Sequence, residues 1–468
     1  MKTIKYLFLG MLMLGFGMRA AAQDNKAAID QVAALIKNKA PEKEVKAVAK
    51  KFKKNAEVLT GIGRVYYELK DTANARDYAT QASKLQYGPA FILLGDLAAL
   101  AEDGGQAASF YDQAIYFDPK NPDGYTRYAT VYRKISPSQA IAKIDELGQQ
   151  RPDIAIDALK GRILYQANEF DEAIKAFAKA DRSKMEERDL RSFAMAYYLT
   201  GKHQSSLEIA EFALAKSPRD AGFNRLAFFC NTDLHNYDKA LEYADRLFNK
   251  SDSAKLTYFD YSYYGNALSG AKKHDEAIAA YKQALEQEFD SSDKRAGVMK
   301  QLSDAYKGMD DYPNAIKYFE QFIQDVSKAS ASDYHSLAQL HVQHANTLEG
   351  DQKRETFLKA DKIYEDMGGK YADIDDFLAF QRARIGMYMD PESKEELAKP
   401  HYERLIELIN AKGEKDATDT KRLIECYRYL ISYYLVVKDD TATAKEWAVK
   451  LQEIDPENET AKQVLELK

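Results

Sequence analysis

Residues that interrupt helices or form covalent cross-links are scarce in this sequence. Its 468 residues include 11 prolines, 23 glycines, two cysteines and one tryptophan. Together with an apolar content of 45%, the low proline and glycine content argues against a disordered chain. Two cysteines, Cys230 and Cys426, allow at most one disulfide bond. A chain of this length is too long for one compact core, so we expect several domains or an elongated array.

Long apolar runs are also missing, except at the N-terminus. No internal run reaches the length of a membrane-spanning helix. The chain starts MKTIKYLFLGMLMLGFGMRAAAQD, with a basic segment at Lys2 and Lys5, an apolar core over residues 6–18 and small residues at 20–22. This order is typical of a secretory signal peptide. The alternative is a buried first helix, but nothing downstream is comparably apolar.

We therefore expect residues 1–22 to be a signal peptide cleaved after Ala22, and the mature chain to be exported to the periplasm or cell envelope. No cysteine follows the cleavage site, so the lipid-anchored form of an export signal is not predicted. Removal of Lys2, Lys5 and Arg19, and of no acidic residue, would take the net charge from −6 to −9. Export and negative charge both argue against an RNA-binding helical repeat, so no nucleic acid partner is expected.

Catalytic motifs are absent from the sequence. It has no phosphate-cradling glycine loop, no nucleophile elbow and no calcium-loop spacing. Of seven histidines only His335, His341 and His344 cluster, and Asp333 or Glu349 is the carboxylate that could complete a metal site with them. The other interpretation is an ordinary polar patch between helices. We expect no enzyme activity, no cofactor and no metal.

The sequence does contain a repeated amphipathic phrase. HDEAIAAYKQALE at residues 274–286 has a near copy, FDEAIKAFAKAD, at residues 170–181. Each phrase has an anchoring small residue, and the same spacing recurs along the chain. The anchors are Ala75, Ala107, Ala140, Ala173, Ser206, Ala240, Ala277, Ala315, Ala360, Ala398 and Ala444. The early intervals are 32 to 34 residues and the later ones 37 to 46. A period of about 34 residues built from two helical patterns indicates a helix-turn-helix solenoid.

The residues around each anchor explain why helices would pack at this period. A small residue such as Gly161 lies twelve positions before its anchor, Ala173, so that the two helix backbones can approach closely. An aromatic residue four positions after the anchor, here Phe177, is expected to fill the gap toward the next hairpin. A second small residue lies seven positions after the anchor. We further expect aspartates two residues before an anchor to cap the second helix. These are Asp171, Asp238 and Asp275.

Prolines at the exits complete the pattern. Pro119, Pro152, Pro218 and Pro456 follow predicted second helices, where a helix must stop. Taken together, these features resemble the tetratricopeptide repeat (TPR) family over most of the mature chain. The resemblance implies an all-α fold, an α-α superhelix (solenoid) of about eleven TPR-like helical hairpins. The sequence departs from the family in having no early-helix tryptophan, since Trp447 is its only one.

The spacing also predicts how the chain is organised. After the signal peptide, residues 23–54 read as an N-terminal helical cap with a charged outer face, and residues 55–326 as a regular array. The small polar stretch at residues 327–333 is the expected boundary. Residues 333–468 then read as longer hairpins and a C-terminal capping helix. We expect one continuous superhelix with a change of curvature near residue 330; two separable arms are the alternative.

The resemblance implies that the first helix of each hairpin lines a concave groove that binds peptides or proteins. By spacing, the groove residues lie fifteen, eleven and eight positions before each anchor. Arginines and aromatic residues collect there, and together they would bind a carboxylate and adjoining apolar groups. The alternative is that the aromatics are packing and the arginines solvated. The predicted peptide-binding residues are Arg64, Tyr67, Arg133, Arg162, Tyr165, Arg191, Tyr198, Arg225 and Phe229. Thr60 and Arg64 replace the lysine and asparagine of the family's carboxylate clamp, which argues against chaperone-tail recognition.

The leading functional hypothesis is a non-catalytic scaffold or adaptor that binds a protein or an extended peptide of acidic or carboxylate-ending character. A glycan-binding protein of the outer envelope is the alternative, favoured by 32 tyrosines and disfavoured by the single tryptophan. Two further expectations follow. Cys230 and Cys426 lie four anchors apart in a linear array and should be buried, unpaired thiols. Reversing Arg162, Arg191 and Arg225 to glutamate should abolish binding and leave helicity intact, because we expect these charges to be exposed.

Overall fold

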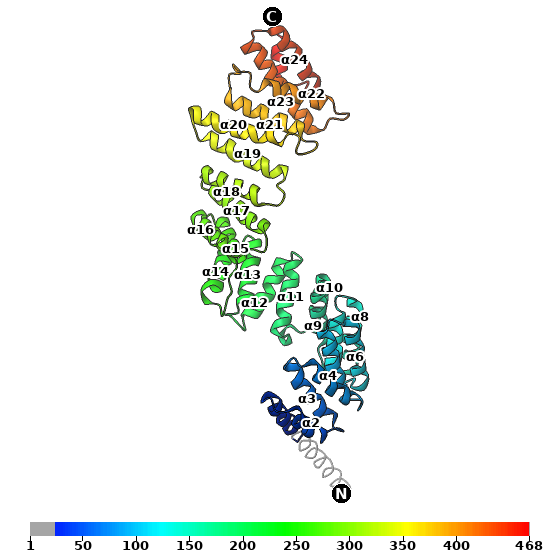
Figure 1. Cartoon of the computed structure of the whole chain (residues 1–468). Helices are drawn as coiled ribbons and strands as arrows, with labels where there is room; N and C mark the ends of the chain where they lie inside the picture. The colour runs from blue at the N-terminus through cyan, green and yellow to red at the C-terminus, as the bar shows by residue number, and fades with distance from the viewer. Residues whose placement is uncertain (1–23, 468) are drawn as a thin grey trace. The chain divides into compact units, whose positions relative to one another are not determined.

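A computed structural model describes residues 24–467 of the chain, so the predicted signal peptide at residues 1–22 lies outside the described residues. Throughout the described range the regular structure is helical (Figure 1), and the one β-type pairing is an isolated parallel bridge between Asp220 and Asp252. By contacts the chain divides into two compact units. Unit 1 comprises Met1–Leu234 and Lys250–Asp252, and unit 2 comprises His235–Asn249 and Ser253–Lys468.

Unit 1 starts with a helix over residues 24–37, and further helices follow in pairs. They are α2 (Glu42–Lys50), α3 (Ala56–Glu68), α4 (Thr72–Ser83), α5 (Gly88–Leu100), α6 (Gly104–Phe117), α7 (Pro122–Tyr132), α8 (Pro137–Gln150), α9 (Ile156–Gln166), α10 (Phe170–Phe177), the short η1 (Arg182–Lys184), α11 (Glu187–Leu199), α12 (His203–Leu214) and α13 (Ala221–Asp233).

Unit 2 continues the pattern with longer helices toward its end. They are α14 (Tyr237–Asp245), the π-helical turn η2 (Arg246–Lys250), α15 (Tyr258–Gly270), α16 (His274–Leu285), α17 (Ser292–Lys307), α18 (Tyr312–Asp325), α19 (Ala331–Asn346), α20 (Gly350–Met367), α21 (Asp375–Met389), α22 (Lys399–Asn410), α23 (Ala417–Ser432), the π-helical turn η3 (Tyr433–Val437), α24 (Thr441–Ile454) and α25 (Glu459–Leu465).

Consecutive helices pack as hairpins, α3 with α4 through α11 with α12 in unit 1, and α15 with α16 through α23 with α24 in unit 2. In chain order, the described residues give eleven helix pairs from α3/α4 to α23/α24, the number expected from the anchors. Ten anchors lie inside the second helix of a pair, Ala398 directly precedes α22, and all eleven are at most 2% exposed. The predicted all-α helical solenoid is therefore confirmed.

In three hairpins the small residue before the anchor makes room for an aromatic ring of the same hairpin. A Cβ atom added to Gly161 would lie 2.6 Å from the ring of Phe177. Gly95 and Gly265 lie in the same way under Tyr111 and Tyr281. The aromatic residue therefore packs mainly within its own hairpin, which the sequence analysis did not predict. It also contacts the next hairpin, since the Phe177 ring centre lies 5.2 Å from that of Phe193.

The turn inside each hairpin has its own repeat. A residue with positive φ lies five positions before nine of the anchors, namely at Lys70, Glu102, Asn168, Gly201, His235, Lys272, Asp310, Ser393 and Asp439. In several hairpins the next residue is an aspartate that caps the second helix; the Asp71 carboxylate, for example, accepts the Asn74 amide at 3.1 Å. Asp103, Asp311 and Asp440 cap α6, α18 and α24 in the same way.

The predicted caps two residues before the anchor were therefore wrong. Asp171, Asp238 and Asp275 lie within the first turn of α10, α14 and α16, and no side-chain cap is present at these three helix starts. The cap position is set by where the left-handed turn residue ends the preceding helix, two residues earlier than assumed. Asp171 instead pairs with Lys202 at 2.8 Å.

Two further expectations can be compared with the fold. Cys230 and Cys426 are unpaired and fully buried, which confirms the prediction for the thiols. The predicted boundary at residues 327–333 lies within unit 2, where Ser330 and Asp333 form a capping box at the start of α19. Within residues 24–467, each helix is too short or too polar to cross a membrane.

Candidate functional site

The nine predicted peptide-binding residues all belong to unit 1. Eight of them lie on the first helices α3, α9, α11 and α13, and Arg133 directly follows α7. Phe229 is buried and the other eight are half-buried, so their side chains are partly packed and partly accessible. We call the first-helix positions fifteen, eleven and eight residues before an anchor the inner face.

Two of the arginines on the inner face already contact carboxylates of the chain. Arg162 Nε of α9 lies 3.3 Å from Asp189 Oδ1 of α11, without the geometry of a hydrogen bond. Arg191 of α11 lies 3.0 Å from Asp220, the capping residue of α13, and 2.6 Å from Glu187. Its guanidinium also lies 4.8 Å from the Phe223 ring centre. These contacts join each first helix to the next.

Similar pairs recur elsewhere in each unit, and we call the whole set the inner ladder. In unit 1, Arg127 of α7 lies 2.6 Å from Asp96 of α5. In unit 2, Lys300 of α17 lies 2.7 Å from Asp333 of α19, and Arg422 of α23 lies 3.0 Å from Asp376 of α21. The basic and acidic partners of the first two of these pairs are 31 and 33 residues apart, close to the repeat period. For these two pairs that spacing was a signal in the sequence, whereas Arg191 and Asp220 are 29 residues apart and Arg422 and Asp376 are 46 apart.

Burial determines the protonation behaviour of the ladder carboxyls. Burial raises the pKa of Asp96 above its usual range, although Arg127 and the Tyr111 hydroxyl oppose the shift. Burial likewise raises the pKa of Asp189, against the opposing charge of Arg162. For Asp220 burial also raises the pKa, but the Phe223 amide and Arg191 together outweigh it and the net shift is downward. The Arg191 pair is therefore the most strongly ionic of the three.

The predicted histidine cluster is spread over separate contacts. His335 Nδ1 lies 2.7 Å from the Tyr364 hydroxyl, and the His344 ring lies 6.2 Å from that of Tyr312. His341 is buried, and its Nδ1 atom has no hydrogen-bond partner. Nowhere in the described part of the chain do three or more His, Cys, Asp or Glu side chains come together in an arrangement that could hold a metal ion.

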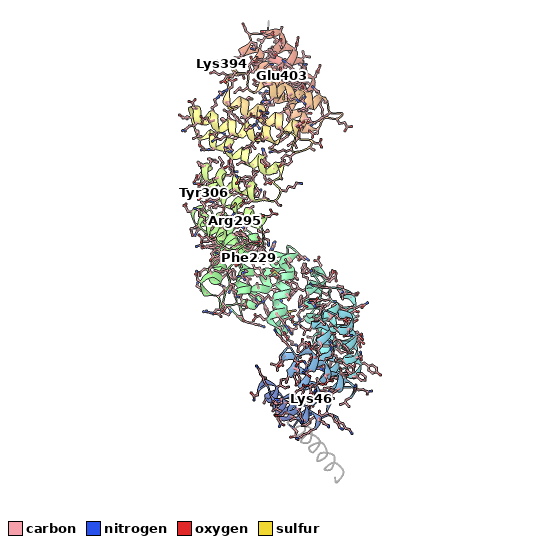
Figure 2. The ribbon with its side chains drawn as sticks, in the orientation of Figure 1. Lys46, Phe229, Arg295, Tyr306, Lys394 and Glu403 are labelled. Carbon is pink, nitrogen blue, oxygen red and sulfur yellow. The ribbon has the colours of Figure 1, made fainter. Side chains whose placement is uncertain are left out.

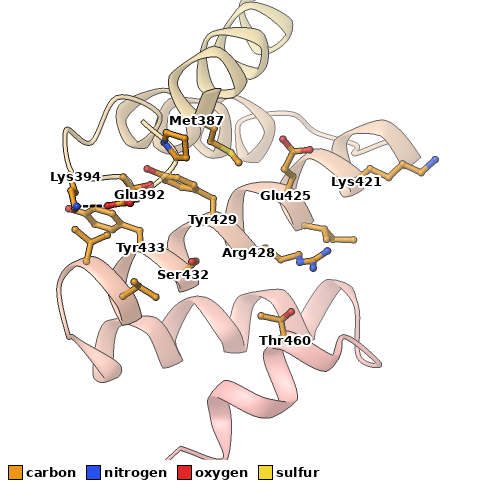
Figure 3. Close-up of a pocket in the computed structure, with 15 residues that line it drawn as sticks. Met387, Glu392, Lys394, Lys421, Glu425, Arg428, Tyr429, Ser432, Tyr433 and Thr460 are labelled. Carbon is orange, nitrogen blue, oxygen red and sulfur yellow. Dashed lines mark ion pairs between the residues drawn. The ribbon is translucent and has the colours of Figure 1, made fainter. Parts of the chain in front are cut away.

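A cleft that the sequence did not predict lies at the C-terminal end of unit 2 (Figure 3). Its volume is 1030 Å³. One wall is a face of α23 that continues into η3, and the others are the end of α21, the loop at residues 391–394 and α25. Its lining residues are Met387, Pro391, Glu392, Ser393, Lys394, Lys421, Ile424, Glu425, Arg428, Tyr429, Ser432, Tyr433, Val436, Val437 and Thr460. We call this space the C-terminal cleft.

The loop wall of the cleft is held by one buried carboxylate. Asp390 is buried and accepts the backbone amides of Lys394 at 2.9 Å and of Glu395 at 2.7 Å. Ser393 in this loop has a φ of 53°, a left-handed conformation that is costly for a residue other than glycine. The two hydrogen bonds to Asp390 therefore hold this loop in its conformation.

The cleft has a charged end and an aromatic end. Figure 3 shows Lys421, Glu425 and Arg428 projecting toward one end, while Tyr429 and Tyr433 project toward the loop. The Glu425 carboxylate accepts the Tyr402 hydroxyl at 2.9 Å and lies 3.7 Å from Arg384. Burial beside this carboxylate raises the pKa of Tyr402 above its usual range.

Comparison with known proteins identifies the repeat. A sequence profile of the tetratricopeptide repeat matches residues 56–87 and 264–290. No curated protein matches the sequence at a significant level. A solved structure of the C-terminal part of a TPR repeat-containing protein from Cytophaga hutchinsonii is 23% identical, with a TM-score of 0.48 over 59% of this chain and 100% of that one.

Two further solved structures are similar to parts of this chain. A tetratricopeptide repeat protein from Parabacteroides merdae is 15% identical, with a TM-score of 0.36 over 53% of this chain and 98% of that one. PilW, a type IV pilus biogenesis factor, is 16% identical, with a TM-score of 0.35 over 42% of this chain and 93% of that one. With TM-scores this low, the matched repeats themselves are the finding that bears on the family.

Proposed function

This chain is a tetratricopeptide repeat protein, and on that premise we propose that it is a non-catalytic scaffold of the bacterial cell envelope that binds a protein or an extended peptide on its inner face. Proteins of this family are typically interaction scaffolds that bind proteins or peptides. The observation that carries the proposal is the row of arginine and aromatic side chains, all but Phe229 half-buried, on the successive first helices α9, α11 and α13 of unit 1. Such a row offers an extended ligand polar and apolar contacts at a regular interval.

The inner ladder changes the role that we assign to the arginines. Arg191 donates to Glu187 and Asp220, and its guanidinium lies so close to Gly222 that any Cβ there would collide with it. A guanidinium carries five N–H donors in a fixed fork, so pairing with the chain's own carboxylates fixes its direction and still leaves donors for a ligand. The ladder therefore orients the arginines in advance of binding.

This packing rules out charge reversal as a clean test of the site. The Arg162 side chain is 17% exposed and that of its partner Asp189 is 5% exposed, so the premise of exposed groove charges was wrong for Arg162, whereas the Arg191 side chain is 42% exposed. Glutamate at position 162 would face a buried carboxylate without compensation and would destabilise α9 and α11. Loss of binding in the triple arginine variant would then report on folding as well as on recognition.

A photo-crosslinking experiment tests the proposal without removing a ladder residue. A photoreactive phenylalanine derivative replaces half-buried Met195, which lies eleven residues before the anchor Ser206 on α11. The control carries it at Lys175, whose side chain is 67% exposed on the second helix α10. In an envelope extract we expect a discrete protein adduct from position 195 and none from position 175. Adducts from position 175 alone, or from neither position, would contradict the inner-face assignment.

Export is part of the same proposal and has its own measurement. The basic start, apolar core and small residues of the first 22 positions support secretion. We expect the protein isolated from the cell envelope to begin at Gln23, as determined by N-terminal sequencing. A protein that begins at Met1 and stays with the cytoplasmic fraction would contradict export.

Glycan binding remains the second candidate because of one surface. Tyr116 of α6 is 79% exposed beside the stacked rings of Tyr128 and Tyr132, whose centres are 4.8 Å apart. These rings and the side chains of Asp112 and Gln113 surround a hollow of 460 Å³. Aromatic faces with adjacent polar groups suit a ligand that is apolar on one side and rich in hydroxyls on the other. Retention on a glycan array that is lost in Tyr116→Ala would favour this function.

A further inference from the structure

The C-terminal cleft differs from the inner ladder in having cations that pair with no carboxylate among residues 24–467. Lys421 and Arg428 are exposed, and neither pairs with an acidic side chain among the described residues. The two acidic residues of the cleft are already occupied, because Glu392 pairs with Lys394, and Glu425 contacts Arg384 and Tyr402. The unpaired charge in the cleft is therefore positive, although the chain as a whole has a net charge of −6.

The two unpaired cations lie on one face of one helix. Positions 421 and 428 are two helical turns apart on α23, or about 10 Å along its axis. Both residues line the cleft and project toward its charged end (Figure 3). An anionic group that enters this end would be attracted by both side chains, and Arg428 could bind a carboxylate with two parallel hydrogen bonds.

The remainder of the cleft is suited to an apolar side chain. Val436 is 78% exposed and Met387 38% exposed, large values for apolar side chains that line a cleft. The Tyr429 hydroxyl, on the same lining, is buried and makes no hydrogen bond of normal geometry. Burial raises the pKa of Tyr429, and the Ser393 hydroxyl opposes that shift.

The walls of the cleft do not have to form on binding. Asp390 fixes the loop on one side, and on the other α23 continues into the π-helical turn η3. Turns of this type are frequent at functional sites, because the wider turn displaces side chains from the regular helical face. A ligand would therefore meet a preformed surface and lose little free energy in ordering it.

We infer that the C-terminal cleft binds a peptide segment of the partner that carries a carboxylate next to an apolar side chain, with Arg428 contacting the carboxylate and Met387 and Val436 the apolar group. The inference rests on the proposed function, since it assigns a second contact of the same partner class. It assigns to unit 2 a carboxylate site whose arginine is unpaired, whereas Arg162 and Arg191 of unit 1 are held in the ladder.

A peptide library tests the inference directly. The full chain is immobilised and offered an N-acetylated random heptapeptide library in two forms, one ending in a free carboxylate and one in an amide. Mass spectrometry of the retained peptides gives their enrichment. For the wild type we expect enrichment of peptides in which a carboxylate lies within three residues of an apolar residue. The amide form separates side-chain carboxylates from terminal ones.

The matched variants are Arg428→Glu and Arg404→Glu. Arg404 lies on α22, outside the cleft, where it pairs with Glu407 at 2.9 Å, so both changes alter the charge of unit 2 equally. We expect enrichment to fall at least tenfold in Arg428→Glu and to persist in Arg404→Glu. Arg428→Gln and circular dichroism serve to separate lost charge from lost structure.

The outcomes distinguish the two proposals. Equal enrichment in wild type and Arg428→Glu would overturn the cleft assignment and leave the scaffold function standing. Retention of peptides without a preference for carboxylates would also overturn the cleft assignment. A concentration-dependent dimer that Arg428→Glu abolishes, without peptide enrichment, would mean that a second copy of the chain fills the cleft. If the wild type retains no peptide at all, the proposed peptide-binding function fails together with the inference.

Discussion

The buried ring of His341 makes the stability of unit 2 depend on pH. His341 lies on α19, and its Nδ1 atom has no hydrogen-bond partner. Burial, together with the nearby positive charges of Lys359 and His344, lowers the pKa of His341 to about 4. In an unfolded chain the pKa of histidine is about 6.5, so the unfolded state takes up this proton first as the pH falls.

We expect a loss of stability between pH 6.5 and pH 4 that depends on this side chain. Because the pKa is lower in the folded state, the contribution of His341 is fully present above pH 6.5, decreases as the pH falls and levels off below about pH 4. The difference amounts to about 2 to 3 kcal/mol at pH 4.5. Urea unfolding of wild type and His341→Leu at pH 7.5 and 4.5 measures it.

The variant should lose less stability than the wild type over this interval. His335, His344 and His401, whose pKa values burial also lowers, titrate in both proteins, so their effect cancels in the comparison. Equal losses in the two proteins would show that the pKa of His341 is the same in the folded and unfolded states, which would contradict the prediction.

Single residues also show why the candidate site was only half predictable from the sequence. The spacing from the anchors located Arg162 and Arg191 on first helices, because that position follows from a helical period. It did not reveal that Asp189 and Asp220 face them, because those partners come from the next hairpin, and the packing of one hairpin on another determines which side chains meet. A solvated arginine and a paired arginine have the same spacing.

At the scale of elements, the hairpin turn relies on residues that are poorly suited to it. Nine of the turns place a residue with positive φ five positions before the anchor, and Gly201 is the only glycine among these nine. For other residues the left-handed region costs about 1 kcal/mol, because Cβ approaches the following carbonyl oxygen. Lys272, in the turn between α15 and α16, has a φ of 62°.

We therefore expect Lys272→Gly to stabilise the protein slightly. Removal of Cβ eliminates a strain of about 1 kcal/mol in the folded state. The greater conformational entropy of glycine in the unfolded chain offsets part of this, so the free energy of unfolding should rise by about 0.5 kcal/mol. The matched control is Gln283→Gly, at an exposed position within α16, which should cost about 1 kcal/mol. Urea midpoints that move in the same direction in both variants would contradict this explanation of the turn.

The turns also mark the limit of prediction at this scale. The anchors identified the helix pairs, because a small buried residue such as Ala173 must recur wherever two helices pack closely. The caps were placed two residues too late because aspartate occurs both at the true cap and within the first turn, as Asp71 and Asp171 illustrate. The C-terminal cleft depends on the loop after α21, whose contacts, held by Asp390, have no counterpart in the regular repeat.

At the scale of the whole molecule, tertiary contacts join neighbours in the sequence. Within each unit the packed pairs are helices that follow one another or belong to consecutive hairpins, such as α9 with α10 and with α11. In an array of this kind, stability is the sum of local terms and neighbour interfaces. Damage to one hairpin should therefore open that hairpin and those beside it, and leave distant helices protected.

Gly161 on α9 is the position at which to test this locality. A Cβ there would lie 2.6 Å from the fully buried ring of Phe177, so Gly161→Ala forces the ring to move at a cost of about 1 to 3 kcal/mol. Gly297→Ala on α17 is the control, because nothing lies within 4 Å of its Cβ position and alanine favours the helix. Hydrogen exchange followed by mass spectrometry measures protection along the chain.

In Gly161→Ala we expect faster exchange in α9 and α10, a smaller effect in α8 and α11, and unchanged protection in α23. Gly297→Ala should slow exchange in α17 or leave it unchanged. Such a local response matters for a scaffold, because one hairpin of unit 1 could then open to admit a ligand while the cleft around Arg428 in unit 2 keeps its shape. Uniform loss of protection from α3 to α24 in Gly161→Ala would mean that the hairpins unfold as a single cooperative body, and binding in one unit could then not be independent of order in the other.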